Sequence, residues 1–280
     1  MDKMIEKRLE IIANTVRKDV VRMTGIARSG HLASSLSIVD ILTVLYWNIM
    51  EVFPEEPNLV SRDRFVLSKG HGCPALYAVL SHRGFFSREE LWNYRRLGAM
   101  LQGHPETPRT PGIDSPSGSL GMGIGVANGM ALYLKRNGFS SRVFCLAGDG
   151  ELQEGSSWES LMMASHYKLG NVALIVDRNM QQSEGRISDI MEIEPLDRKL
   201  EAFGWETVTV DGHDMSALDR VMSSVSGEKP VAVIANTIAG KGVSFIESSA
   251  SGPERTELTR DLMDQALREL NSQVENREDS

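Results

Sequence analysis

The residues best suited to bind a metal ion in this chain are an aspartate and an asparagine that each follow an apolar run. Asp149, between Gly148 and Gly150, comes just after the run 142–146, and Asn179 follows the run 172–177, 30 residues beyond Asp149 (179 − 149). Short apolar runs of this kind predict buried strands, and ligands of α/β proteins collect where parallel strands end. Carboxylate and amide oxygens suit Mg²⁺, which binds few protein carboxylates beside phosphate oxygens and water. The spacing therefore predicts a site for a cation and a phosphate-bearing ligand.

The same residue types also occur in ordinary turns. Gly, Asp and Asn are common there, so the Gly-Asp-Gly segment could be a plain turn and Asn179 a helix cap. The two glycines would equally let a ligand approach the backbone closely. Spacing alone leaves both interpretations open.

Three of the six histidines, His31, His71 and His104, lie in segments flanked by Gly or Pro rather than on a periodic helix face. An imidazole can take a proton from a hydroxyl and stabilise an oxyanion near neutral pH. Each of these histidines alone is more simply explained as a hydrogen-bonded structural residue. The other three histidines, His82, His166 and His213, do not lie in segments of this kind. We expect them at the surface or in contact with the residues that form the site.

Strand and helix patterns alternate along the chain, which predicts an α/β fold with a mostly parallel sheet covered by helices on both faces. The Gly-, Pro- and Ser-rich stretch 98–125 predicts a long ordered loop. Strands are expected at 64–68, 142–146, 172–177, 206–210 and 230–237, and helices at 4–28, 37–47, 74–80, 126–136, 156–166, 196–203, 214–226 and 257–270.

Composition sets the class of protein and excludes several partners. The 280 residues are 41% hydrophobic and 24% charged, as in globular proteins, and we expect one domain over 1–255 followed by a helix and a frayed tail over 256–280. A net charge of −8 argues against a nucleic-acid surface. The apolar stretches fall short of the ~20 residues that span a bilayer, and the charged N-terminus does not resemble a signal peptide. Two separated cysteines favour the cytoplasm.

Five motifs, in order, resemble those of the transketolase family, over roughly residues 10 to 245. Their order along the chain makes the resemblance specific. The motifs are Ser29-Gly30-His31, the stretch 63–72 ending in Lys69-Gly70-His71-Gly72, Gly103-His104-Pro105-Glu106, the glycine-rich stretch 117–123, and Gly148-Asp149-Gly150 with Glu154, Asn179 and Ser183-Glu184-Gly185.

The resemblance implies that the chain binds thiamine diphosphate and a divalent cation, Mg²⁺ or alternatively Ca²⁺ or Mn²⁺. Asp149, Asn179 and the backbone carbonyl of Gln181 would be the metal ligands. His31 and His104 would face the substrate, and together with His71 they are the implied catalytic residues. The implied cofactor-binding residues are His71, Gly118, Ser119, Leu120, Gly148, Gly150, Glu151, Glu154 and Asn179, with Glu154 at a subunit interface.

The chain has the length of the N-terminal half of a transketolase. The resemblance therefore implies the N-terminal subunit of a two-chain enzyme that moves a two-carbon ketol unit from a ketose (phosphate) donor to an aldose acceptor. The C-terminal half carries the glutamate and the pyrimidine-binding residues of the family, so activity would require a C-terminal partner subunit. We expect the chain to pair with a second copy inside a heterotetramer.

One departure from the family pattern bears on the substrate. Transketolases carry a histidine after the last strand of this half, and this chain has none after His213. Ser119 also stands where the family often has proline. These differences point to an altered donor, a specialised pathway or weakened activity. Two alternatives stay open: another thiamine-diphosphate-dependent synthase or transferase with an altered substrate, and a non-catalytic paralogue.

Overall fold

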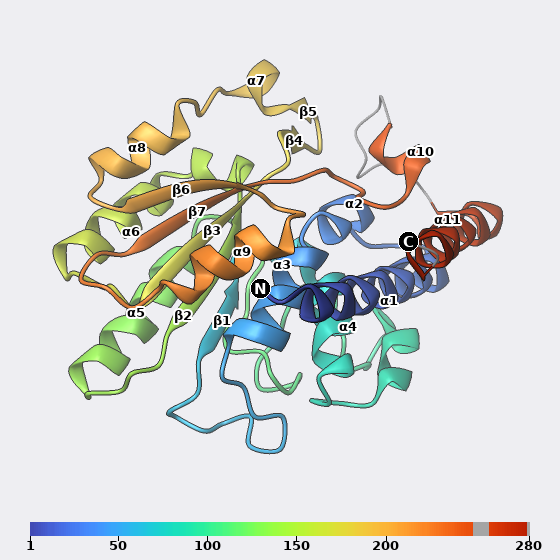
Figure 1. The fold of residues 1–280 in the computed structure, drawn as a ribbon, viewed down its shortest axis with the longest axis horizontal. Coiled ribbons are helices and arrows are strands. Elements are labelled where there is room, and N and C mark those ends of the chain that lie inside the picture. The colour runs from blue at the N-terminus through green and yellow to red at the C-terminus, as the bar shows by residue number, and fades with distance from the viewer. Residues whose placement is uncertain (249–257, 279–280) are drawn as a thin grey trace.

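A five-stranded parallel sheet forms the centre of the protein (Figure 1). The computed structural model describes residues 1–248 and 258–278. The strands follow the order β1-β2-β3-β7-β6, so their carboxyl ends lie at one edge. Their bounds are β1 (Arg64–Leu67), β2 (Val143–Gly148), β3 (Val172–Arg178), β6 (Glu206–Asp211) and β7 (Val231–Asn236).

The apolar runs form strands because both faces of the sheet are buried. Successive side chains of a strand point to opposite faces. Phe144 and Leu146 accordingly belong to one hydrophobic core, whereas Val143 and Cys145 belong to the other. This two-sided burial explains why β1, β2, β3 and β7 read as continuous apolar runs, whereas the exposed edge strand β6 alternates.

Helices cover both faces, which confirms the predicted α/β architecture. On one side the core is shared with α1 (Lys3–Ala27), α2 (Leu32–Leu36), α3 (Val39–Val44), α4 (Cys73–His82) and α9 (Met215–Ser223). On the other side it is shared with α5 (Gly123–Arg136), α6 (Gly155–His166) and α8 (Leu196–Ala202). The shorter elements are η1 (Leu45–Ile49), η2 (Gly70–Gly72), η3 (Arg88–Asn93), η4 (Gly150–Gln153), α7 (Ile187–Ile190), α10 (Ser244–Glu247) and the antiparallel pair β4 (Gln181–Gln182) and β5 (Gly185–Arg186).

The C-terminal helix α11 (Arg260–Glu278) lies along α1 (Figure 1). Leu270 and Ala266 are buried there, and Asn14 Nδ2 donates a hydrogen bond to the Leu270 carbonyl at 3.0 Å. The helix continues to Glu278, beyond the expected end at residue 270, and the fraying of the segment 271–280 stays a prediction. The expected domain boundary at 255/256 and residues 279–280 lie outside the described residues.

The segment 32–49 differs from the continuous helix expected over 37–47. It consists of α2, α3 and the π-helical turn η1. Contrary to the expectation from the sequence, the 18 residues are long and apolar enough to span a membrane by length and composition. However, 89% of the segment is buried inside the protein, as in the core helices of a globular fold.

Candidate active site

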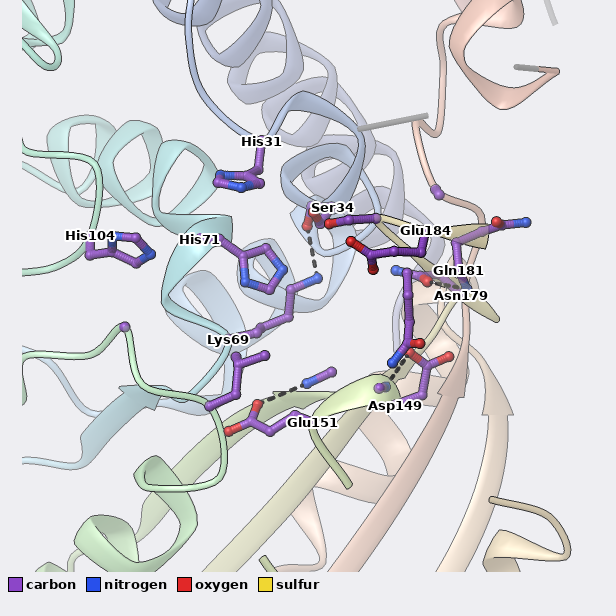
Figure 2. A pocket seen from close by; sticks show the side chains of 17 residues that line it. His31, Ser34, Lys69, His71, His104, Asp149, Glu151, Asn179, Gln181 and Glu184 are labelled. Atoms are coloured by element: carbon purple, nitrogen blue, oxygen red, sulfur yellow. Dashed lines mark hydrogen bonds between the residues drawn. The ribbon is translucent and has the colours of Figure 1, made fainter. Parts of the chain in front are cut away.

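A cavity of about 340 Å³ opens at the carboxyl ends of the central strands. Residues just after β1, β2, β3 and β7 contribute to its wall, as expected for ligand sites of parallel sheets. Figure 2 shows three histidines on one side of Lys69 and the residues after β2 and β3 on the other. The lining residues are His31, Ser34, Lys69, His71, His104, Gly118, Leu120, Gly148, Asp149, Gly150, Glu151, Asn179, Gln181, Gln182, Ser183, Glu184 and Ala239.

Asp149 is a buried carboxylate at the floor of the cavity, with 2% of its surface exposed. Its Oδ1 accepts a hydrogen bond from the Gly150 N–H at 2.9 Å, and its Oδ2 accepts one from the Met180 N–H at 2.7 Å. Burial, and secondarily the nearby Asp177 carboxylate, raise the pKa of Asp149 to about 7. A cation bound here would favour the charged form of this carboxylate.

Asn179 lies beside Asp149 because the chain turns sharply after β3. Met180 adopts a left-handed conformation with φ of 61°, which is uncommon for a residue other than glycine. Asn179 Nδ2 donates to Asp177 Oδ2 at 3.1 Å, and Asn179 Oδ1 accepts from the Gln181 N–H at 3.0 Å. An ionised carboxylate only accepts and an N–H only donates, so these partners fix which end of the amide carries the oxygen.

A buried ion pair lies next to these residues. Lys69 Nζ donates to Asp177 Oδ2, and it also donates to the Ser34 carbonyl at 3.0 Å. Asp177 is fully buried and accepts further hydrogen bonds from Ser37 Oγ at 2.7 Å and from Thr237 Oγ1. One carboxylate therefore joins the segments that follow β1, β3 and β7.

Glu151 is a second buried carboxylate, but its oxygens are bonded within the protein. Oε1 accepts from Ser68 Oγ and from the Gly121 N–H at 2.8 Å, and Oε2 accepts from the Gly148 N–H at 3.2 Å. Burial raises the pKa of Glu151, although the three hydrogen-bond donors act to lower it. Glu151 thus fixes the segment around Gly121 to the end of β2, and its direct contact with a cofactor stays a prediction.

The three loop histidines meet in the cavity although they are far apart in the sequence. The rings of His31 and His71 are 5.1 Å apart between centroids, and His104 lines the same wall. Burial, followed by Lys69 and the other two histidines, lowers the pKa of His71 to about 2, so this imidazole is neutral near pH 7. Burial also lowers the pKa of His104, with smaller effects of His31 and Arg95.

The cavity fits a cofactor with a diphosphate and a metal ion. The side chain of Gln182, which also lines the cavity, packs against Gly150, where an added Cβ would lie 2.5 Å from Gln182 Nε2. His31 Nδ1 is buried and lacks a hydrogen-bond partner among the described residues, as expected of an atom that a ligand satisfies. The volume is also in the usual range for small-molecule sites.

Two predicted site residues lie outside the cavity. Ser119 lines a shallower neighbouring cavity of about 250 Å³ formed by residues 116–126. Glu154 is exposed at the start of α6 and does not line the cavity, although its N–H donates to the carbonyl of the lining residue Glu151 at 3.1 Å. The histidines expected elsewhere are indeed absent from the wall: His82 pairs with Asp19, and His213 Nδ1 lies 2.7 Å from Asp40 Oδ2.

The sequence interpretation assigned no role to several residues of the site. For two of them the sequence carried a signal. Lys69 lies inside one of the five motifs. Asp177 ends an apolar run, where a buried carboxylate needs a specific partner. Their contacts depend on the tertiary fold. The other lining residues without an assigned role are Ser34, Gln182, Ser183, Glu184 and Ala239.

The fold and the cavity define a thiamine-diphosphate-binding domain, and comparison with known proteins agrees. The family model "Transketolase, thiamine diphosphate binding domain" matches residues 9–253. The chain therefore belongs to the transketolase family.

Individual relatives show which part of a transketolase the chain represents. It is 38% identical to one of the subunits of the apulose-4-phosphate transketolase of Phocaeicola vulgatus, covering 95% of both chains. It is 39% identical to the 6-deoxy-6-sulfo-D-fructose transketolase subunit SqwG of a Clostridium species, covering 92% of this chain and 94% of the relative. The crystal structure of Campylobacter jejuni transketolase has a TM-score of 0.88 and 31% identity, and the match covers 97% of this chain but 43% of that one.

These matches identify the chain as the N-terminal subunit of a transketolase divided into two chains. Both of these shorter relatives carry transketolase names, which favours ketol transfer over the synthase and the non-catalytic alternatives.

Proposed function

We propose that this chain, assembled with a C-terminal partner subunit, transfers a two-carbon ketol unit from an anionic ketose to an aldose acceptor. The observation that carries the proposal is the meeting of Asp149 and Asn179 beside a cavity that also contains three histidines. The proposed ligands of a divalent cation are Asp149 Oδ, Asn179 Oδ1 and the Gln181 carbonyl. Mg²⁺ is the first choice and Ca²⁺ or Mn²⁺ the alternatives, because all three ligands are oxygens.

The glycine-rich segments would hold the rest of the cofactor. Gly148, Gly150, Gly118 and Leu120 line the cavity and are proposed to contact thiamine diphosphate together with His71. When bound, this cofactor supplies the carbon nucleophile and the electron sink for breaking a carbon–carbon bond. Ser119 and Glu154 are proposed to meet the cofactor only across the interface with another subunit.

His31 and His104 are proposed to act on the substrate. A donor hydroxyl must lose a proton and an acceptor oxyanion must gain one during ketol transfer, and imidazoles at the cavity wall can do both. The lowered pKa of His104 keeps this ring neutral and able to accept a proton near pH 7. His71, which is also neutral, can orient a ligand by hydrogen bonding without adding charge.

The donor is proposed to carry a negatively charged end, with a ketose phosphate as the first candidate. The two shorter relatives are named for apulose-4-phosphate and for 6-deoxy-6-sulfo-D-fructose, which are both anionic. The absence of a histidine after His213 distinguishes this chain from the usual family pattern and favours a specialised donor.

The partner subunit is proposed to dock on the outer face of α5, next to the cavity. Met122, Val126 and Tyr133 expose 57%, 38% and 56% of their surface there, and an added Cβ on Gly129 would meet no atom within 4 Å. Exposed apolar side chains on one helix face are typical of protein interfaces. We also propose that two such chains and two partner subunits form a heterotetramer. A cytoplasmic location is proposed because Cys73 and Cys145 are free and buried.

The proposal is tested with the co-expressed complex. Purified complex with thiamine diphosphate and Mg²⁺ should release more than one equivalent of aldose per site from a ketose phosphate only when an aldehyde acceptor is present to take the two-carbon unit. Cofactor binding without any acceptor-dependent transfer, over a panel of phosphorylated and sulfonated ketoses, would refute the ketol-transfer function. A monomeric mass of the complex by light scattering would refute the heterotetramer.

A further inference from the structure

The segment that carries His104 has little regular structure to support it. It belongs to the stretch between η3 and α5, which contains no helix or strand. Backbone carbonyls in such a stretch need hydrogen-bond donors from elsewhere when they are buried. The donors for residues 102–104 come from one face of α4.

Two side chains of α4 bind three consecutive carbonyls of this segment. Tyr77 Oη lies 3.0 Å from the Gln102 carbonyl and 2.9 Å from the His104 carbonyl, and these two oxygens share its single hydroxyl proton. Cys73 Sγ lies 3.2 Å from the Gly103 carbonyl and donates to it. Cys73 and Tyr77 are four residues apart, so they lie on the same face of the helix.

Both donors are in a position to stay protonated. Cys73 and Tyr77 have no exposed surface. Burial raises the pKa of the Cys73 thiol to about 12 and raises the pKa of Tyr77 as well. A thiol and a phenol remain donors at neutral pH under these conditions, whereas a thiolate would repel the carbonyl oxygens.

The opposite side of the segment is also held. The Arg95 guanidinium packs on Gly103, where an added Cβ would lie 2.7 Å from Arg95 Nε. Arg95 Nη1 donates to Ser29 Oγ, two residues before His31. The backbone at Gly103 is therefore fixed between α4 and a residue that also reaches the His31 segment.

We propose that Tyr77, supported by Cys73, is a positioning residue that sets the location of His104 in the active site. The helix that begins two residues after His71 then also holds His104, so the relative position of the two imidazoles depends on α4. The inference rests on the proposed function, because it assigns His104 to the substrate. Tyr77 does not line the cavity and acts only through the backbone that it binds.

The first test is a double-mutant cycle in the complex with the partner subunit. Loss of one hydrogen bond corresponds to at most about a tenfold change in rate, so Tyr77→Phe should lower kcat on the order of tenfold with less than about a twofold change in the affinity for thiamine diphosphate. In a His104→Gln background the same substitution should have almost no further effect. An equal, additive loss in both backgrounds would overturn the proposal.

The second test does not depend on activity. Amide hydrogen exchange of residues 102–104 in the complex should be faster in Tyr77→Phe than in the wild type. Tyr46→Phe is the matched control, because Tyr46 is also buried, packs on Phe65 and does not line the cavity. Unchanged exchange at 102–104 would overturn the positioning role. A wild-type complex without ketol transfer would refute the proposed function instead, while the exchange result would still decide the positioning role.

Cys73 provides a second variant if Tyr77→Phe does not fold. Cys73→Ala removes the donor to Gly103 and should also speed amide exchange at 102–104, whereas Cys73→Ser keeps a donor and should restore slow exchange. Cys145→Ala is the control, since Cys145 is a buried cysteine in β2. Slow exchange in Cys73→Ala, equal to that of the control, would contradict the proposal.

Discussion

Lys69 and Asp177 form a buried ion pair at the edge of the cavity, between the histidines and the proposed metal ligands. Their side chains expose 1% and 0% of their surface. Asp177 also accepts the Nδ2 hydrogen bond of Asn179, so the pair orients a proposed metal ligand. A buried charge pair of this kind costs free energy if one partner is removed.

The first prediction concerns this pair. Lys69→Met leaves the Asp177 carboxylate buried without its cation, and the free energy of unfolding should fall by about 3–5 kcal/mol. Chemical denaturation measures the change. Arg109→Met is the control, because its ion pair with Glu106 is about half exposed and should contribute less than about 1 kcal/mol. Equal stability of the two variants would show that the pair is not important for the fold.

The second prediction concerns Asp149. Asp149→Ala should abolish binding of thiamine diphosphate with Mg²⁺ to the complex, because a metal ligand and the acceptor for the Met180 N–H are both lost. Titration calorimetry gives the affinity. The exposed Asp189 of α7 supplies the control, and Asp189→Ala should bind as the wild type does. Undiminished affinity of Asp149→Ala would refute its assignment as a ligand.

The third prediction is a pH dependence of stability caused by His71. Its folded pKa of about 2 lies below the unfolded value of about 6.5. Between these values the unfolded chain binds a proton that the folded chain does not bind, so stability falls as the pH decreases below 6.5. The contribution of His71 to this loss should be about 1.5 kcal/mol between pH 6.5 and 5.

His71→Gln should therefore lose less stability over this pH interval than the wild type. Urea unfolding at several pH values measures the difference. The exposed His166 serves as the control, and His166→Gln should follow the wild-type curve. A His71→Gln curve parallel to that of the wild type would contradict the low pKa.

The fourth prediction concerns the partner. Val126→Glu places a charge on the apolar face of α5 and should prevent co-purification of the partner subunit while the chain stays folded. Ile11→Glu is the matched control, because Ile11 exposes a similar fraction of its surface, 44%, but lies on α1. Loss of the partner in Ile11→Glu but not in Val126→Glu would place the interface elsewhere.

The sequence predicted the fold well because β1, β2, β3 and β7 are buried on both faces and read as short apolar runs. The edge strand β6 is largely exposed and alternates in sequence, and it too was placed within about two residues. The segment 32–49 was harder, since nearly all of it is buried and its apolar residues carry no period that marks the break between α2 and α3. The length of α11 was underestimated because its polar sequence does not reveal that it packs on α1.

Residue type and spacing at two strand ends indicated Asp149 and Asn179 as one of two interpretations, and the family resemblance added the three loop histidines; the structure brings all five residues to one cavity. The contacts of Lys69 with Asp177 and of Tyr77 with residues 102–104 join positions far apart in the chain, and no local pattern encodes them. For Ser119 and Glu154, no chemistry in the residues themselves indicated a role. Their assignment came from the family resemblance, and a role of either residue at the cofactor stays a prediction.

The most direct test of the account is a crystal structure of the complex soaked with thiamine diphosphate and Mn²⁺, with anomalous diffraction used to locate the metal. The account predicts one anomalous peak that contacts the side-chain oxygens of Asp149 and Asn179 and the diphosphate. A diphosphate bound elsewhere, or a metal peak that touches neither side chain, would contradict it.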